Sequence, residues 1–300
     1  AIIAAVLVAL QQGVQRVMAR VAGGNALWPL SFVPSIAYWV LMCNEDYTLV
    51  GLVAMTVAVW SAVGITCVKN SWLRMAATLV GLVALWLAVG GAAVVAWVAL
   101  LAIELTTKRD WRVIAGAVAV VAVVAVVWWL RPWQLSNEGM VTGGLYHRYS
   151  DIPLDVFYKL WAATAAVMIV PIFVARYVRE WMNVVAVVAV VAVFGAAAVI
   201  LPKHFNANSE DSMAYYYLTH NGQWNEVIER ARKHDPQTRP AMVCLNLSLV
   251  MTGQSGERLF DFPQYGPAGL FMTYEEDLLF CGEVLYHLGF INEAQRYAYE

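Results

Sequence analysis

The hydrophobic and polar positions divide the chain into two parts that differ in kind. Up to Leu201, long apolar runs alternate with short polar connections, and after Pro202 the apolar residues follow helical spacing. A helix of about 20 apolar residues is long enough to cross the roughly 30 Å hydrocarbon core of a bilayer. We therefore predict an all-α protein, with a transmembrane helix bundle over residues 1–201 and a separate helical domain over residues 202–300.

The apolar runs of the first part predict about eight membrane spans. Six are single runs, at residues 1–20, 27–43, 47–68, 113–130, 154–178 and 182–201. The stretch 75–105 is too long for one span and is broken at Gly90 and Gly91, so we expect it to double back there as two short spans. Pro34 should kink or shorten the second span, because proline lacks the N–H that an inner helical position needs.

Basic residues predict which side of the membrane faces the cytoplasm. They accumulate in cytoplasmic loops, and charge also favours the reversal at Gly90. When the predicted spans cross the membrane in alternating directions, nine basic residues fall on one side of it. The connections on the other side contain only Arg131, Arg148 and Lys159. The nine are Arg16, Arg20, Lys69, Arg74, Lys108, Arg109, Arg112, Arg176 and Arg179. We predict an inner-membrane protein whose residues 202–300 lie outside the cytoplasm, in the periplasm of a Gram-negative source.

Three helix–glycine–helix patterns follow one another in the second part. Their glycines, Gly222, Gly253 and Gly289, lie 31 and 36 residues apart, close to the period of about 34 residues of tetratricopeptide repeats. We expect an α-solenoid of tetratricopeptide-like helix pairs, each packed on its neighbours. Residues 260–273 interrupt the pattern and should form a loop. We expect that loop to expose three candidates for contact with a protein partner: Phe260, Phe262 and Tyr265.

Composition supports the membrane assignment and limits the chemistry. The chain has 61% hydrophobic and 13% charged residues, whereas soluble chains average about 25% charged. A net charge of -2 gives no reason to expect nucleic-acid binding. The four cysteines lack the paired spacing of a zinc or redox site, so no cofactor is predicted. Cys244 and Cys281 are buried thiols or, in an oxidising compartment, a disulfide.

Two outer loops of the membrane part contain candidate site residues. Glu45 and Asp46 could hold a divalent metal and a phosphate-bearing lipid, but a solvated turn is the simpler interpretation, because a hard cation needs several oxygen ligands. His147, Arg148 and Asp151 could contact an anionic head group or a sugar, although interfacial anchoring is the better explanation for this loop. No ionisable residue lies in the middle of a predicted span, which disfavours an ion-coupled transporter.

Four segments together resemble an uncharacterised family of bacterial multi-spanning membrane proteins. They are PLSFVP at 29–34, CNEDY at 43–47, GGA at 90–92, and the run from Leu245 to Arg296. The resemblance implies a membrane domain followed by an extracytoplasmic tetratricopeptide-like domain, and it implies that full members begin earlier and end later. It implies no activity for any residue.

Two functions fit this architecture. In the first, the protein is not an enzyme, and its helical repeats bind a protein partner or organise an envelope complex. In the second, the protein is a polytopic glycosyltransferase-like enzyme that acts on lipid-linked sugars, with Glu45 and Asp46 in its site. Replacing both acids by alanine should leave the first function intact and abolish the second.

Overall fold

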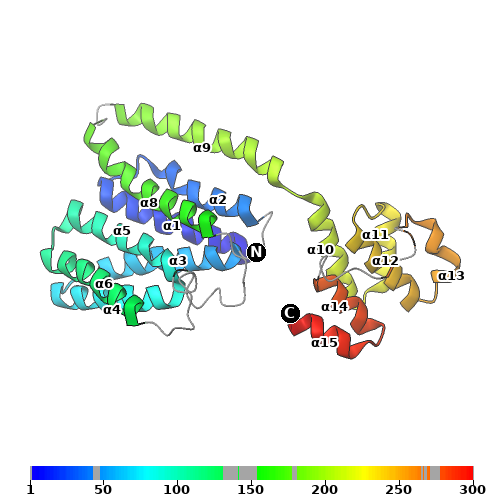
Figure 1. The fold of residues 1–300 in the computed structure, drawn as a ribbon. Coiled ribbons are helices and arrows are strands. Elements are labelled where there is room, and N and C mark those ends of the chain that lie inside the picture. The colour runs from blue at the N-terminus through cyan, green and yellow to red at the C-terminus, as the bar shows by residue number, and fades with distance from the viewer. Residues whose placement is uncertain are drawn as a thin grey trace. The chain divides into compact units, whose positions relative to one another are not determined.

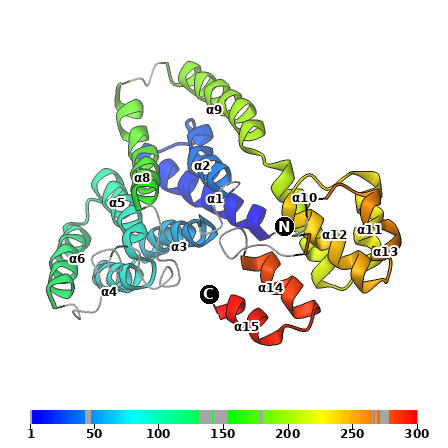
Figure 2. The same ribbon diagram turned by 45° about the vertical axis from the view of Figure 1, so that its right-hand side comes forward.

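The chain folds into helices that form two compact units. The structure is a computed structural model that describes residues 2–42, 48–130, 141, 154–177, 181–264, 266, 269–270 and 278–299. Every regular element among these residues is helical, which confirms the all-α class. The two units are residues 1–205 and 206–300, and both are drawn in two orientations (Figure 1, Figure 2).

Unit 1 contains the long apolar helices. Six stretches in the described residues are long and apolar enough to cross a membrane, at 2–22, 49–67, 71–108, 111–130, 156–174 and 182–204, and they indicate a membrane protein. The elements are α1 (Ile2–Ala22), η1 (Trp28–Ser31), α2 (Phe32–Met42), α3 (Thr48–Cys67), α4 (Ser71–Val89), η2 (Gly90–Ala92), α5 (Ala93–Ile103), η3 (Glu104–Lys108), α6 (Trp111–Leu130), α8 (Leu154–Tyr177) and α9 (Met182–His204).

The stretch 71–108 doubles back at Gly90, as the sequence predicts. Gly90 has a φ of 60°, which ends α4, and the short turn η2 leads into α5. A straight helix would separate residues 74 and 104 by about 45 Å, at about 1.5 Å per residue. Instead, Arg74 Nε lies 3.2 Å from Glu104 Oε1. The hairpin is therefore a property of the fold, while the number of helices that cross a bilayer stays a prediction.

The second predicted span is shorter than expected. Its helical part, 28–42, consists of the 3-10 turn η1 and the 11-residue helix α2. Pro29 lies in η1, and Pro34 is the third residue of α2. N–H groups in the first turn of a helix have no intrahelical partner, so proline costs little there. Pro34 therefore accompanies a shortened helix whose regular part begins only at residue 32.

The core of unit 1 forms where α1, α3, α5 and α8 meet. Small residues allow close approach: a Cβ on Gly13 would lie 2.8 Å from Val59 of α3, and one on Gly91 would lie 2.1 Å from the ring of Trp161 of α8. Only 17% of the α9 span is buried, against 56% of the α3 span. The exposed surface of α9 is rich in valine, which suits contact with lipid tails.

Unit 2 is built from helices joined by three turns of one geometry. In each turn, a glycine with positive φ donates its N–H to the carbonyl three residues back, and the next residue donates to the carbonyl five residues back, which is the Schellman motif. The glycines are the three that the sequence singles out: Gly222, Gly253 and Gly289. The helices are α10 (Ala207–His220), α11 (Trp224–Lys233), α12 (Arg239–Met251), α13 (Ser255–Arg258), η6 (Leu259–Asp261), α14 (Leu278–His287) and α15 (Ile291–Tyr299).

Helix α12 forms the centre of unit 2. All nine residues from Ala241 to Leu249 are buried, and the helix packs against α10, α11 and α14. A helix that is buried all round must be surrounded by other elements. Cys244 of α12 and Cys281 of α14 are both buried thiols in this structure. The second of the three helix pairs, α12 and α13, departs from a regular pair, because α13 has only four residues.

Candidate functional site

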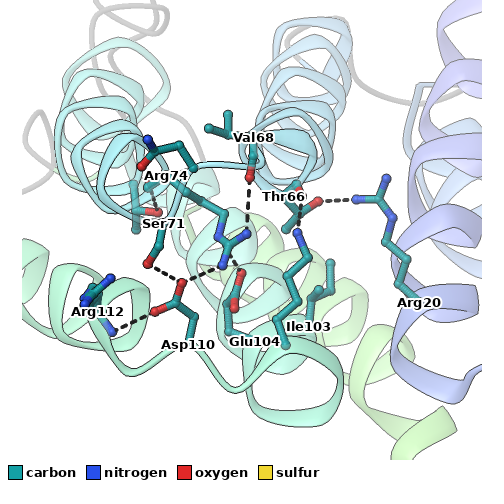
Figure 3. Close-up of polar contacts among 12 residues, drawn as sticks. Arg20, Thr66, Val68, Ser71, Arg74, Ile103, Glu104, Asp110 and Arg112 are labelled. Carbon is teal, nitrogen blue, oxygen red and sulfur yellow. Dashed lines mark hydrogen bonds and ion pairs between the residues drawn. The ribbon is translucent and has the colours of Figure 1, made fainter.

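Three charged side chains meet at one end of unit 1. Arg74 lies in the first turn of α4, Glu104 begins the π-helical turn η3, and Asp110 precedes α6. Figure 3 shows Arg74 between the two acids. We name Arg74, Glu104 and Asp110 the ion cluster. Its position follows from local structure, because Asn70 caps α4 by accepting the N–H groups of Trp72 and Leu73.

The ion cluster is almost completely removed from solvent. The side chains of Arg74, Glu104 and Asp110 are 7%, 1% and 15% exposed. Arg74 Nη2 donates to Asp110 Oδ2 at 2.7 Å, and Arg74 Nη1 donates to the carbonyl of Val68 at 3.2 Å. One guanidinium therefore joins the end of α3, the end of α5 and the start of α6.

Glu104 is the least satisfied member of the ion cluster. Its contact with Arg74 is an ion pair without hydrogen-bond geometry, and neither carboxylate oxygen receives a hydrogen bond from the described residues. Burying a carboxylate in this way is costly unless a charge compensates it. Glu104 also lies in a π-helical turn, and such turns are frequent at functional sites. The arrangement can hold the hairpin closed and can accept a hydrogen bond.

Asp110 has a different environment from Glu104. Ser71 Oγ donates to its Oδ2 at 2.5 Å, and the backbone N–H of Arg112 donates to its Oδ1 at 3.1 Å. The Ser71 hydrogen bond is the largest of the effects that hold the pKa of Asp110 below its ordinary value, while burial opposes it. Asp110 is therefore the firmly charged acid of the cluster.

Further basic residues gather beside the ion cluster. Lys108 Nζ donates to the carbonyl of Thr66, Arg20 donates to Thr66 Oγ1, and Thr107 Oγ1 donates to the carbonyl of Arg20 at 3.0 Å. The ends of α1, α3 and η3 therefore lie together. Arg20, Arg74 and Lys108, which the sequence places on one side of the membrane, do occupy one end of unit 1. Which compartment that end faces stays a prediction.

Unit 2 contains a groove of about 500 Å³ between α12 and the segment that follows it. We name it the repeat-domain groove. Asn246 and Gln264 hold this segment in place through reciprocal amide hydrogen bonds of 2.9 and 3.1 Å, and Asn246 also donates to the carbonyl of Gly269 at 2.9 Å. The lining residues are Asn246, Val250, Ser255, Leu259, Phe260, Gln264, Gly266, Gly269 and Leu270.

The structure separates the residues that the sequence proposes for partner contact. Phe260 is 88% exposed and lines the repeat-domain groove. Phe262 was expected to be exposed, and this expectation is wrong: the residue is only 7% exposed and packs in the core of unit 2. The backbone becomes extended after η6, and the segment buries one ring while it leaves the other in solvent. Tyr265 lies outside the described residues, as do Glu45, Asp46, His147, Arg148 and Asp151.

The family of the chain can be stated directly. Residues 1–300 match a family model described as a family of unknown function. The chain belongs to DUF6057. This membership agrees with the expectation of an uncharacterised family, while the bacterial source and the tetratricopeptide character of DUF6057 stay predictions. No curated protein and no solved structure matches the chain.

The ion cluster of this DUF6057 chain was not predicted, because Glu104 lies inside the stretch 75–105, which reads as apolar. A usable signal was present. Arg74 and Glu104 lie 16 and 14 residues from Gly90, so a hairpin that turns at Gly90 brings them face to face.

Among the described residues, no group of three or more His, Cys, Asp and Glu side chains is placed to hold a metal ion.

Proposed function

We propose that the chain is an integral membrane protein that presents a tetratricopeptide-like helical-repeat domain to a protein partner outside the cytoplasm. The membrane part is supported by the six long apolar stretches of unit 1. The repeat character is supported by three glycine turns with the same pair of hydrogen bonds. Stacked helix units of this kind generate surfaces that commonly bind other proteins.

The observation that carries the proposal is the repeat-domain groove with Phe260 at its edge. An aromatic side chain that is 88% exposed costs free energy of solvation in the isolated chain. Aromatic residues, phenylalanine among them, are also enriched at protein interfaces. The groove offers apolar contact from Val250, Leu259 and Leu270, and amide groups from Asn246 and Gln264. We infer that a partner segment inserts an apolar side chain there and bonds to the amides through its backbone.

Site-specific photo-crosslinking in living cells tests this function. A photoreactive phenylalanine analogue at position 260 of the full chain should produce one discrete crosslinked species. The matched control is position 217, because Tyr217 is also aromatic, 65% exposed and in unit 2, but does not line the groove. Val250→Glu should remove the crosslink from position 260 by placing a charge in the groove.

Two results would contradict the proposal. One is the same crosslinked species from positions 260 and 217, which would show that exposure alone explains the capture. The other is a crosslink from position 260 that survives Val250→Glu at normal membrane abundance of the variant.

A further inference from the structure

One face of α1 carries polar side chains along its later turns. They recur at the spacing of three and four residues that defines one face of a helix, at Gln12, Gln15, Arg16 and Arg20. Apolar residues on the other side of the same turns are buried in the core, at Val14, Val17, Met18 and Val21. Because α1 is long and apolar enough to be a span, its polar face needs partners other than lipid tails.

The polar face lines a groove of about 490 Å³, which we name the α1 groove. Its lining residues are Gln12, Gln15, Arg16, Ala19, Arg20 and Asn25. Five of the six side chains can donate hydrogen bonds, two of these carry a positive charge, and none is acidic. The groove is therefore suited to a negatively charged group with several acceptor oxygens.

Arg16 is held in position by α3. Its guanidinium lies over the ring of Trp60, with the carbon of the group 4.4 Å from the ring centroid. The Trp60 ring is itself fixed against α1, because its Nε1 donates to the carbonyl of Ala9 at 2.9 Å. A cation–π contact orients a guanidinium without neutralising its charge.

Arg20 is held at the end of α3. It donates to the carbonyl of Val63 at 3.2 Å, to Oγ1 of Thr66 (Figure 3) and to Sγ of Cys67 at 3.4 Å, and none of these acceptors is a carboxylate. Within the described part of the chain, no carboxylate lies at ion-pair distance from Arg16 or Arg20. Two oriented guanidinium groups therefore border one groove, and the described residues place no countercharge beside them.

We propose that the α1 groove binds the phosphate of an anionic phospholipid. Guanidinium groups bind phosphate oxygens through paired N–H groups, and the amides of Gln12, Gln15 and Asn25 supply further donors. The groove occupies the last turns of a candidate span and the loop after it. Basic pockets at that level of a membrane protein meet lipid head groups, which favours a lipid phosphate over a soluble one.

Lipid titration of the full chain, followed by native mass spectrometry, tests this site. The probes are phosphatidylglycerol, phosphatidylcholine and inorganic phosphate, each added to protein purified in a non-ionic detergent. The wild type should bind phosphatidylglycerol more tightly than phosphatidylcholine, and Arg16→Gln should weaken phosphatidylglycerol binding about fivefold, the loss expected for one basic residue near a head group. Arg16 is exposed, so its replacement removes the contact with Trp60 and leaves the buried face of α1 unchanged.

Arg112→Gln is the matched control. Arg112 also lies over a tryptophan, with its guanidinium carbon 4.7 Å from the Trp72 ring centroid, but it does not line the α1 groove. This variant should bind phosphatidylglycerol as the wild type does. Equal phosphatidylglycerol affinity in Arg16→Gln and the wild type, or equal affinity of the wild type for the two lipids, would overturn the proposal. Displacement of phosphatidylglycerol by inorganic phosphate at a comparable concentration would assign the groove to a soluble anion instead.

Discussion

Arg74 is the member of the ion cluster that contacts both acids. Its guanidinium pairs with Glu104, donates to Asp110 and donates to the backbone of Val68. The two acids are not equivalent, because Asp110 receives hydrogen bonds from Ser71 and from the Arg112 backbone, whereas Glu104 receives none from the described residues. Hydrogen bonds from Ser71, from Arg74 and from the Arg112 backbone therefore stabilise the charge of Asp110 in a way that Glu104 does not share.

Ser71→Ala should lower the free energy of unfolding at neutral pH by about 1.5 kcal/mol, the value of a hydrogen bond to a charged group, and should lower Tm accordingly. The Ser71 hydroxyl lowers the pKa of Asp110 in the folded chain. A group with a lowered folded pKa contributes stability above its unfolded pKa, which is about 3.9 for aspartate, and loses it as the pH falls through the folded value. The difference in Tm between variant and wild type should therefore be full above about pH 5 and shrink below about pH 4.

Ser35→Ala is the control for this pH dependence. The Ser35 hydroxyl also donates a buried hydrogen bond within unit 1, but its acceptor is the neutral carbonyl of Leu7, at 3.0 Å. Its effect on Tm should not change with pH. Parallel pH profiles for the Ser71 and Ser35 variants would show that the Ser71 hydroxyl does not act through the charge of Asp110.

At the scale of elements, the α4–α5 hairpin shows what a sequence can and cannot predict. The reversal at Gly90 was predictable, because a glycine pair interrupts a stretch that is too long for one span. The closure by Glu104 was missed, because it depends on a charge that lies inside an apolar stretch. The packing of Gly91 against Trp161 depends on a helix about 70 residues further along the chain, and no local pattern signals it.

In unit 2, likewise, some features have local causes in the sequence, and others depend on residues that are far apart in the chain. The three glycine turns were predictable, because a Schellman turn favours a residue that adopts positive φ without strain. The short α13 and the burial of Phe262 were not. Both lie beside the segment that Asn246 and Gln264 hold, and these two residues are 18 positions apart.

The hairpin predicts an order of stability for two variants. Arg74→Gln should destabilise unit 1 more than Glu104→Gln does. The first change leaves two carboxylates without their cation, whereas the second leaves Arg74 paired with Asp110. Breaking a buried pair costs about 3 to 5 kcal/mol when one charge is left uncompensated. Heating the full chain in detergent and measuring the remaining monodisperse protein by fluorescence-detected chromatography gives the order.

Arg112→Gln provides the reference for these two variants, because it removes a positive charge close to the ion cluster while leaving both acids paired with Arg74. It should cause the smallest loss of the three. A larger loss in Glu104→Gln than in Arg74→Gln would mean that Arg74 is not the central member of the cluster.

At the scale of the whole molecule, unit 2 (residues 206–300) follows α9 in the sequence, and α9 is the last of the long apolar helices in the described residues. The proposed function requires this part of the chain to lie outside the cytoplasm. Alkaline phosphatase joined after Phe205 should therefore be active in living cells, and a fluorescent protein that matures only in the cytoplasm should be dark at the same point. The physical basis is the excess of basic residues on the other side of the spans.

The loop that carries Arg109 provides the opposite control for these fusions. It belongs to the end of unit 1 where Arg20, Arg74 and Lys108 gather. Phosphatase joined after Arg109 should be inactive, and the fluorescent protein should mature there. Active phosphatase at Arg109 together with inactive phosphatase at Phe205 would reverse the assigned orientation.

The pairing of Arg74 with Glu104 also bears on how the protein is made. During translation, Arg74 leaves the ribosome before Glu104, so the cation is already present when the acid emerges. The free energy of transferring an unpaired glutamate into lipid is unfavourable, and pairing with an arginine that is already present lowers this cost. If α4 and α5 are two membrane spans, as the sequence predicts, we expect the insertion machinery to release them into the bilayer together, once the second half of the hairpin has been synthesised.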